Sequence, residues 1–318
     1  MKDHLLTQHV PRCFILLIPV LFFLWGNSAV AQLSGTKYIG GAAPDYATID
    51  AAIADLNTQG VTDPGVTFLI ASGTYSSSTT LLVTTITGTA SAPIIFKPDA
   101  GATVIVEKTG TAGTVWQLAA GVNHLTIDGS NTPGGSTRDL TIINTVPGTV
   151  YALTAAGNNP NCLFTNLIVD AGAGSTANRN STSSIGIRVH YSGSESNETR
   201  IINNYITNAG IGIRMEGNSL VLNNNISNNI INNVGVTGIY ALYASNTIIS
   251  YNDVQVPEGT GTTTYGIQLG SSIQGNFRVF DNKIHNIKSN STSTSTTAGI
   301  AGIYSTSTST GGTPPRAG

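Results

Sequence analysis

Residues 185–191, IGIRVHY, and residues 211–217, IGIRMEG, are two copies of a repeat that decides the fold. The Gly-Ile pair recurs between Ile185 and Tyr304 in steps of 26, 26, 28 and 36 residues. The five copies are Gly186-Ile187, Gly212-Ile213, Gly238-Ile239, Gly266-Ile267 and Gly302-Ile303. Apolar and polar residues alternate after each of the first four pairs, as in a β-strand with one buried face. Such a short unit cannot bury its apolar side chains alone, so successive units must stack as a solenoid. The repeat therefore predicts a parallel β-helix.

A second motif, in which Asn precedes a short apolar segment, recurs between the Gly-Ile pairs. Its copies are Asn203-Asn204-Tyr205-Ile206, Asn228-Asn229-Ile230-Ile231, Tyr251-Asn252-Asp253-Val254 and Asp281-Asn282-Lys283-Ile284. Stacked coils lie about 4.8 Å apart, so we expect the Ile of each pair to stack on the next. Asn at a turn can also hydrogen-bond to its copy in the neighbouring coil. A disordered Asn-rich tract would lack regularly spaced Ile, so an ordered solenoid is favoured.

The N-terminus has the features of a secretory signal peptide. Lys2 and Arg12 precede an apolar run from Cys13 to Trp25, and Ala29-Val30-Ala31 is a small-residue cleavage pattern. The run is shorter than the roughly 20 residues that a membrane-spanning helix needs. We predict a signal peptide over residues 1–31, cleaved after Ala31. The mature protein is expected to be secreted or held at the cell surface, with no membrane insertion after the signal is removed.

Charge and cysteine content exclude several classes of partner and site. Loss of Lys2, Asp3 and Arg12 with the leader changes the formal net charge from −2 to −3. A weakly acidic chain does not favour nucleic acid or an anionic membrane as a partner. Cys162 is then the one remaining cysteine, which excludes an internal disulfide and a cysteine-based metal site. A buried thiol is favoured over a catalytic one. We predict no cofactor and no metal.

One segment has the period of a helix. Ile49, Ala52, Ile53 and Leu56 lie on one stripe, with Thr48 placed to cap the helix and Gly60 to end it. We predict a helix over residues 48–56 that covers the open end of the first coil.

The remaining chain divides by composition. Residues 32–61 are expected to form the N-terminal segment with its capping helix, and residues 62–304 the β-helix. Ser289 to Thr297 is expected to be a loop inserted between coils. Residues 305–318, rich in Ser, Thr, Gly and Pro, are expected to be a truncated end, because they supply no cap for the last coil.

Several segments resemble the pectin-lyase-like right-handed parallel β-helix superfamily. They are residues 46–53 (YATIDAAI), 66–70 (VTFLI), 73–75 (GTY) and 124–129 (HLTIDG). Residues 56–61 and 90–96 further resemble large secreted or surface β-helix proteins of Bacteroidetes. The resemblance covers about residues 38–304 and implies an all-β, right-handed parallel β-helix with an N-terminal capping helix. The crossover preference of parallel strands favours the same handedness.

Enzymes of this superfamily carry signatures that are missing here. Polygalacturonase-like members have Asn-Thr-Asp, Asp-Asp, Gly-His-Gly and Arg-Ile-Lys segments, none of which occurs in this chain. Asp128 and Asp170 each end a predicted strand before Gly or Ala-Gly, where turn chemistry explains them better than acid–base catalysis. We therefore expect a noncatalytic adhesive or glycan-binding module. The alternative is a polysaccharide lyase or glycoside hydrolase.

The repeat itself supplies a candidate binding face. If the Ile of each pair points inward, the alternate side chains stack on one outer face, and these are Arg188, His190, Arg214, Glu216, Tyr240 and Gln268. Across five coils this face would be about 20 Å long. Arg and Glu can bond hydroxyls or carboxylates, and Tyr rings can pack on sugars. The expected partner is a polysaccharide or cell-surface glycan, preferably acidic. An ordinary solvated sheet face would show the same pattern.

Overall fold

The computed structural model describes residues 31–84, 86–172, 175–191, 195–196, 198–217, 221–257, 259, 263–289 and 299–306. The predicted signal peptide up to residue 30, residues 290–297 of the predicted inserted loop and residues 307–318 of the predicted tail lie outside the described residues. The strands and helices belong to the compact unit that begins at Gln32.

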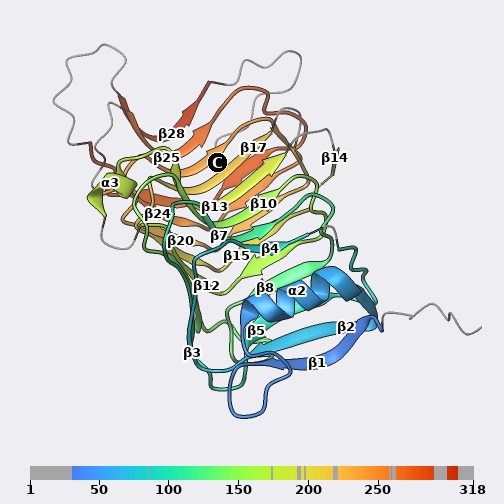
Figure 1. The fold of residues 1–318 in the computed structure, drawn as a ribbon. Helices are drawn as coiled ribbons and strands as arrows, with labels where there is room; N and C mark the ends of the chain where they lie inside the picture. The colour runs from blue at the N-terminus through green and yellow to red at the C-terminus, as the bar shows by residue number, and fades with distance from the viewer. Residues whose placement is uncertain are drawn as a thin grey trace, which may run out of the picture. The chain divides into compact units, whose positions relative to one another are not determined.

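Three large parallel sheets form this unit (Figure 1). Sheet I contains β1 (Leu33–Ile39), β2 (Val61–Ile70), β5 (Ile94–Pro98), β8 (Leu125–Asp128), β11 (Leu163–Thr165), β15 (Arg200–Ile202), β19 (Asn225–Ser227), β23 (Ile248–Ser250) and β26 (Arg278–Phe280). Sheet II contains β3 (Gly73–Ser77), β6 (Val104–Lys108), β9 (Leu140–Asn144), β12 (Leu167–Asp170), β16 (Tyr205–Thr207), β20 (Ile230–Asn232), β24 (Asp253–Gln255) and β27 (Lys283–His285). Sheet III contains β4 (Leu81–Val83), β7 (Thr114–Leu118), β10 (Val150–Ala156), β13 (Ser184–Tyr191), β17 (Ile211–Gly217), β21 (Thr237–Ala241), β25 (Thr263–Leu269) and β28 (Gly299–Ser305).

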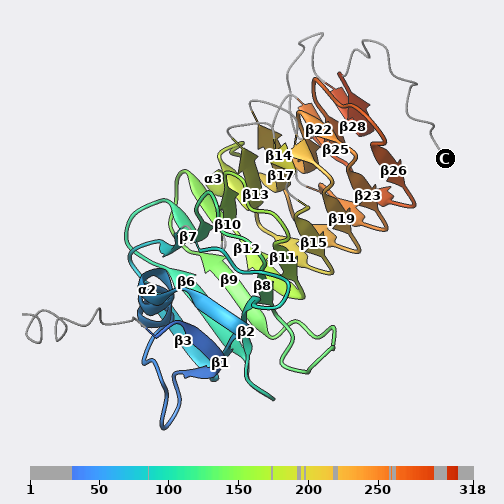
Figure 2. The same ribbon diagram turned by 90° about the vertical axis from the view of Figure 1, so that its right-hand side faces the viewer.

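From β2 onward the chain passes through sheets I, II and III in turn and then returns to sheet I one coil further along (Figure 2). A small fourth sheet of β14 (Glu195–Ser196), β18 (Val221–Leu222) and β22 (Ala244–Ser245) follows sheet III in three successive coils. This winding is the parallel β-helix that the repeat predicts.

The Ile residues of the Gly-Ile pairs stack as expected. Ile187 pairs with Ile213, and the same register continues through Ile239, Ile267 and Ile303. The first four of these side chains are fully buried. They form an apolar row along the inside of sheet III, and its burial favours stacking of the coils.

The glycine of each pair departs from strict alternation. Alternation alone would turn Gly212 outward, because its neighbour Ile213 points inward. A Cβ on Gly212 would instead lie 2.6 Å from the Cγ2 atom of Ile231, a fully buried side chain of sheet II. Gly212 therefore faces the core, and two consecutive residues of the repeat are directed inward.

Asparagine forms an internal ladder at the turns between sheets I and II. Asn204 donates to Asn229 Oδ1 at 2.9 Å, Asn229 to Asn252 Oδ1 at 2.9 Å, and Asn252 to Asn282 Oδ1 at 2.8 Å. The preceding residues are left-handed, with φ of 58° at Asn203 and 57° at Asn228, which Asn tolerates well. The ladder was predicted from the repeated Asn motif.

The predicted helix forms as α2 (Ile49–Gln59), and the four stripe residues are buried. Thr48 caps it by accepting a hydrogen bond from the Ala51 N–H at 3.1 Å, and Gly60 follows its last turn with φ of 70°. Asn57 donates to Leu82 O at 2.8 Å and accepts from Thr84 N at 2.9 Å, so the helix satisfies backbone groups on and directly after β4, the edge strand of sheet III. Its role as a lid on the first coil stays a prediction. A second helix, α3 (Thr176–Arg179), is a single turn.

Candidate functional site

Sheet III brings the predicted binding residues together. Arg188 pairs with Arg214 in the next coil, Arg214 with Tyr240, and Tyr240 with Gln268. We call these four side chains the outer row. His190 stands opposite Glu216 two residues further along the same strands. The geometry of the predicted face is therefore present, whereas its role in binding stays a prediction.

Glu216 lies between the two arginines of the outer row. Arg188 donates from Nε and Nη2 to Glu216 Oε1 at 2.9 and 2.7 Å, and Arg214 Nη2 lies 2.5 Å from Glu216 Oε2. Parallel pairing places the two arginines in adjacent coils, where their charges would repel. Glu216 is two residues beyond Arg214 and faces the same side, so its carboxylate reaches both guanidinium groups. Only 8% of this residue is exposed, which strengthens both charge-assisted contacts.

His190 borders this cluster without adding to its charge. Burial, and then the positive charge of Arg188, lower the pKa of His190 below its ordinary value, while Glu216 acts in the opposite direction. His190 Nδ1 is 3.6 Å from Glu216 Oε1 and has no hydrogen-bond partner among the described residues. The imidazole is therefore neutral at pH 7, and Arg188, Arg214 and Glu216 together carry one net positive charge.

The lowered pKa of His190 predicts a pH-dependent stability. The unfolded chain binds the proton near its ordinary pKa of 6.5, and the folded chain binds it only at lower pH. As the pH falls below about 6.5, protonation therefore favours the unfolded state, and the folded state loses stability until the folded pKa is passed. We expect the melting temperature of the wild-type protein to fall relative to that of His190→Gln between about pH 7 and pH 5. A constant difference between the two melting curves would contradict this assignment.

Aromatic rings flank the arginines on the same face. The Arg188 guanidinium lies 4.9 Å from the ring centre of Tyr151, and that of Arg214 lies 5.4 Å from the ring centre of Tyr240. Further along, Tyr265 and Tyr304 stack with their centres 4.5 Å apart. Such cation–π and stacking contacts hold the rings in fixed orientations.

Sequence reasoning missed Tyr151 and Tyr265 as members of this face. Both precede the inward-facing pair of their strand, so two inward residues rather than one lie between Tyr151 and Thr154, and between Tyr265 and Gln268. Strict alternation assigns these tyrosines to the core. The signal that could have found Tyr151 is the match of Tyr151-Ala152-Leu153-Thr154 with Ile185-Gly186-Ile187-Arg188, which are paired in the structure.

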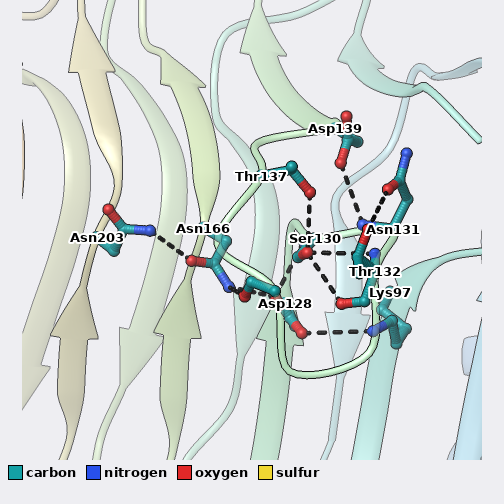
Figure 3. A network of polar contacts seen from close by, with 10 residues as sticks. Lys97, Asp128, Ser130, Asn131, Thr132, Thr137, Asp139, Asn166 and Asn203 are labelled. Carbon is teal, nitrogen blue, oxygen red and sulfur yellow. Dashed lines mark hydrogen bonds and ion pairs between the residues drawn. The ribbon is translucent and has the colours of Figure 1, made fainter. Parts of the chain in front are cut away.

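Asp128 and Asp170 have the turn roles expected of them. Asp128 Oδ1 accepts from Ser130 N at 3.0 Å and from Asn166 Nδ2 at 2.7 Å, and Lys97 Nζ lies 3.6 Å from Oδ2 (Figure 3). Asp170 accepts from Gly172 N at 3.0 Å and from Asn208 Nδ2 at 2.8 Å. Both carboxylates therefore stabilise turns and link neighbouring coils.

Cys162 is a free, fully buried thiol, as expected, and burial raises its pKa to about 12. In the described part of the chain, no group of three or more His, Cys, Asp or Glu residues is arranged to hold a metal ion. The same part contains no helix that is long and apolar enough to span a membrane.

No protein-family model and no curated protein matches this chain. Solved structures do match it. The pectate lyase Pel9A superposes with a TM-score of 0.52 at 13% identity, over 80% of this chain and 64% of the lyase chain. The chain has the parallel β-helix fold that it shares with this lyase.

Two further solved structures are more distant from this β-helix. The PL6 family alginate lyase AlyGC has a TM-score of 0.41 at 13% identity, over 78% of this chain and 38% of its own. The pectin methylesterase PemA from Erwinia chrysanthemi has a TM-score of 0.38 at 10% identity, over 86% of this chain and 93% of its own. At these identities the similarity describes the fold, and it assigns no role to any side chain. The β-helix spans just under two thirds of the pectate lyase chain.

Proposed function

We propose that this β-helix is a secreted or cell-surface protein that binds an acidic polysaccharide along the outer face of sheet III. One observation carries the proposal. Arg188, Arg214, Tyr240 and Gln268 form a continuous row with one side chain per coil. The ring of Tyr151 borders the row, and the exposed Tyr304, stacked on the buried Tyr265, continues it in the next coil.

The chemistry of the row fits a glycan. Guanidinium groups donate in a planar fork to carboxylates and pairs of hydroxyls, the Gln268 amide can donate and accept, and tyrosine rings present apolar faces. The inner positions repeat Ile in every coil while the outer positions change from Arg to Tyr to Gln. A regular scaffold with a varied display is how solenoids build extended binding surfaces. The net positive charge of the arginine–glutamate cluster supports the acidic preference.

Replacing both arginines tests the site. We expect Arg188→Gln/Arg214→Gln to bind polygalacturonate about tenfold more weakly, because two charge-assisted contacts worth roughly 1.4 kcal/mol together are lost. Glutamine keeps an N–H that can bond Glu216, so the buried carboxylate is not left unpaired. Wild-type binding should also weaken with salt, since exposed charges are screened over about 8–10 Å. Affinity is measured by calorimetric titration.

The matched control is Arg200→Gln/Arg278→Gln. It removes the same charge from exposed arginines on sheet I. We expect this variant to bind within about twofold of wild type, because the lost charges lie on another face. Equal losses in the two double variants would show a nonspecific charge effect and would contradict the site.

The alternative function is cleavage of such a polymer. His190, Arg188 and Glu216 converge on one face, and the matched structure is by name a pectate lyase. A neutral imidazole beside guanidinium groups can act as a general base. Release of unsaturated uronate ends from polygalacturonate by wild type but not by His190→Gln, with binding retained in both, would select the enzyme. Intact polymer after prolonged incubation with wild type would favour the binding module.

A further inference from the structure

The carboxylate of Glu216 contacts the same two guanidinium groups that the proposed site offers to an acidic ligand. Glu216 Oε1 contacts the Arg188 guanidinium, and Glu216 Oε2 contacts that of Arg214. A uronate carboxylate recognised by this pair would need the same N–H groups. The ligand and the protein's own side chain therefore compete for the arginines.

The arginines are not saturated by Glu216. Arg188 uses Nε and Nη2 on a single oxygen, so the planar fork does not engage both carboxylate oxygens. Arg214 contacts Glu216 through Nη2, its Nη1 is 3.5 Å from Thr182 O, and its Nε has no partner among the described residues. A buried N–H without a partner carries a desolvation cost that a better-placed acceptor would remove. Glu216 therefore leaves part of the hydrogen-bonding capacity of both guanidinium groups unused.

We propose that Glu216 is an internal substitute for the ligand carboxylate and sets the affinity of the outer row for acidic glycans. This inference rests on the proposed function of the same face. Without ligand, Glu216 relieves the repulsion between the arginines and holds them in place. With ligand, it must yield or share their N–H groups, which lowers affinity and restricts binding to densely charged uronate polymers. Glu216 is thus a specificity-determining residue.

Glu216→Gln tests whether the Glu216 carboxylate competes with the ligand, since glutamine keeps the shape of the side chain and removes its charge. We expect this variant to bind polygalacturonate about tenfold more tightly than wild type, because one competing charge is lost and the local charge doubles. Binding of neutral galactan should stay within about twofold, since no carboxylate is involved. The matched control is Glu107→Gln, which removes one charge from sheet II, where Glu107 accepts a hydrogen bond from Ser76 at 3.2 Å. It should bind as wild type does.

Thermal unfolding gives an independent readout. Without a carboxylate between them the arginines repel, so Glu216→Gln should melt at a lower temperature than wild type. Free galacturonate should raise the melting temperature of Glu216→Gln more than that of wild type, because it binds the folded state of the variant more tightly. Galactose, which lacks the carboxylate, should raise neither. This readout remains usable if the variant is too unstable for titration.

The outcomes separate this inference from the proposed function. If Arg188→Gln/Arg214→Gln weakens binding but Glu216→Gln binds no more tightly than wild type, the role of Glu216 is overturned and the binding face stands. If the arginine variant binds as wild type does, the face itself is overturned. If neither wild type nor Glu216→Gln binds polygalacturonate, and galacturonate stabilises neither, both proposals are overturned.

Discussion

Asn229→Ala is expected to destabilise the β-helix by about 3–5 kcal/mol, because it removes four buried hydrogen bonds and takes the acceptor away from the Asn204 N–H. The Asn229 side chain accepts from Asn204 N at 3.0 Å and Asn204 Nδ2 at 2.9 Å, and it donates to Ile201 O and Asn252 Oδ1, both at 2.9 Å. Asn229 is fully buried, so water cannot replace these partners without opening the coil. The loss spreads across three coils, since Asn204, Asn229 and Asn252 each belong to a different one.

Asn225→Ala is the matched control. Asn225, four positions before Asn229, is the first residue of β19. Its Oδ1 has no hydrogen-bond partner in the described part of the chain. We expect this variant to lose no more than about 0.5 kcal/mol. Urea unfolding monitored by circular dichroism measures both variants. Similar midpoints for Asn229→Ala and Asn225→Ala would show that the ladder contributes nothing beyond an ordinary asparagine.

Gly212→Ala is expected to cost about 2–3 kcal/mol through overpacking. The added Cβ would lie 2.6 Å from Ile231 Cγ2 and 2.6 Å from the carbonyl oxygen of Gly238 in the next coil. Neither neighbour can move freely, because one is a buried core side chain and the other belongs to a paired strand. Relief requires separating coils or forcing the isoleucine from its rotamer.

Gly302, in the last copy of the Gly-Ile motif, is the matched control for Gly212. At Gly302, the described residues place only Ile284 Cγ2 near an added Cβ, at 3.8 Å, which is ordinary van der Waals contact. We expect Gly302→Ala to change stability by less than about 0.5 kcal/mol. The same substitution in the same sequence motif should therefore have different effects. Equal shifts in melting temperature for Gly212→Ala and Gly302→Ala would refute the close-packing explanation for this glycine.

The candidate binding face could be predicted in part from the sequence repeat. Equal spacing identifies equivalent residues, and parallel stacking then places equivalent residues side by side, so Arg188, Arg214, Tyr240 and Gln268 could be aligned without coordinates. The repeat likewise places Arg188 and Arg214 in adjacent coils, where two positive charges require a counter-charge. It could not show that Glu216 would contact both at once, because that depends on side-chain conformations and on how deeply the carboxylate is buried.

The sequence by itself determined the solenoid, its stacked isoleucines, its asparagine ladder and a helix predicted over residues 48–56, which the structure extends to Gln59. Each of these rests on a local pattern that recurs or is capped by neighbouring residues. Tertiary structure alone decided which way Gly212 faces and on which side Tyr151 and Tyr265 lie. An extra inward residue in a strand moves every preceding side chain to the opposite face. Whether a strand accommodates that residue depends on the space left by Ile231 and its equivalents on sheet II, which lie far away in the sequence.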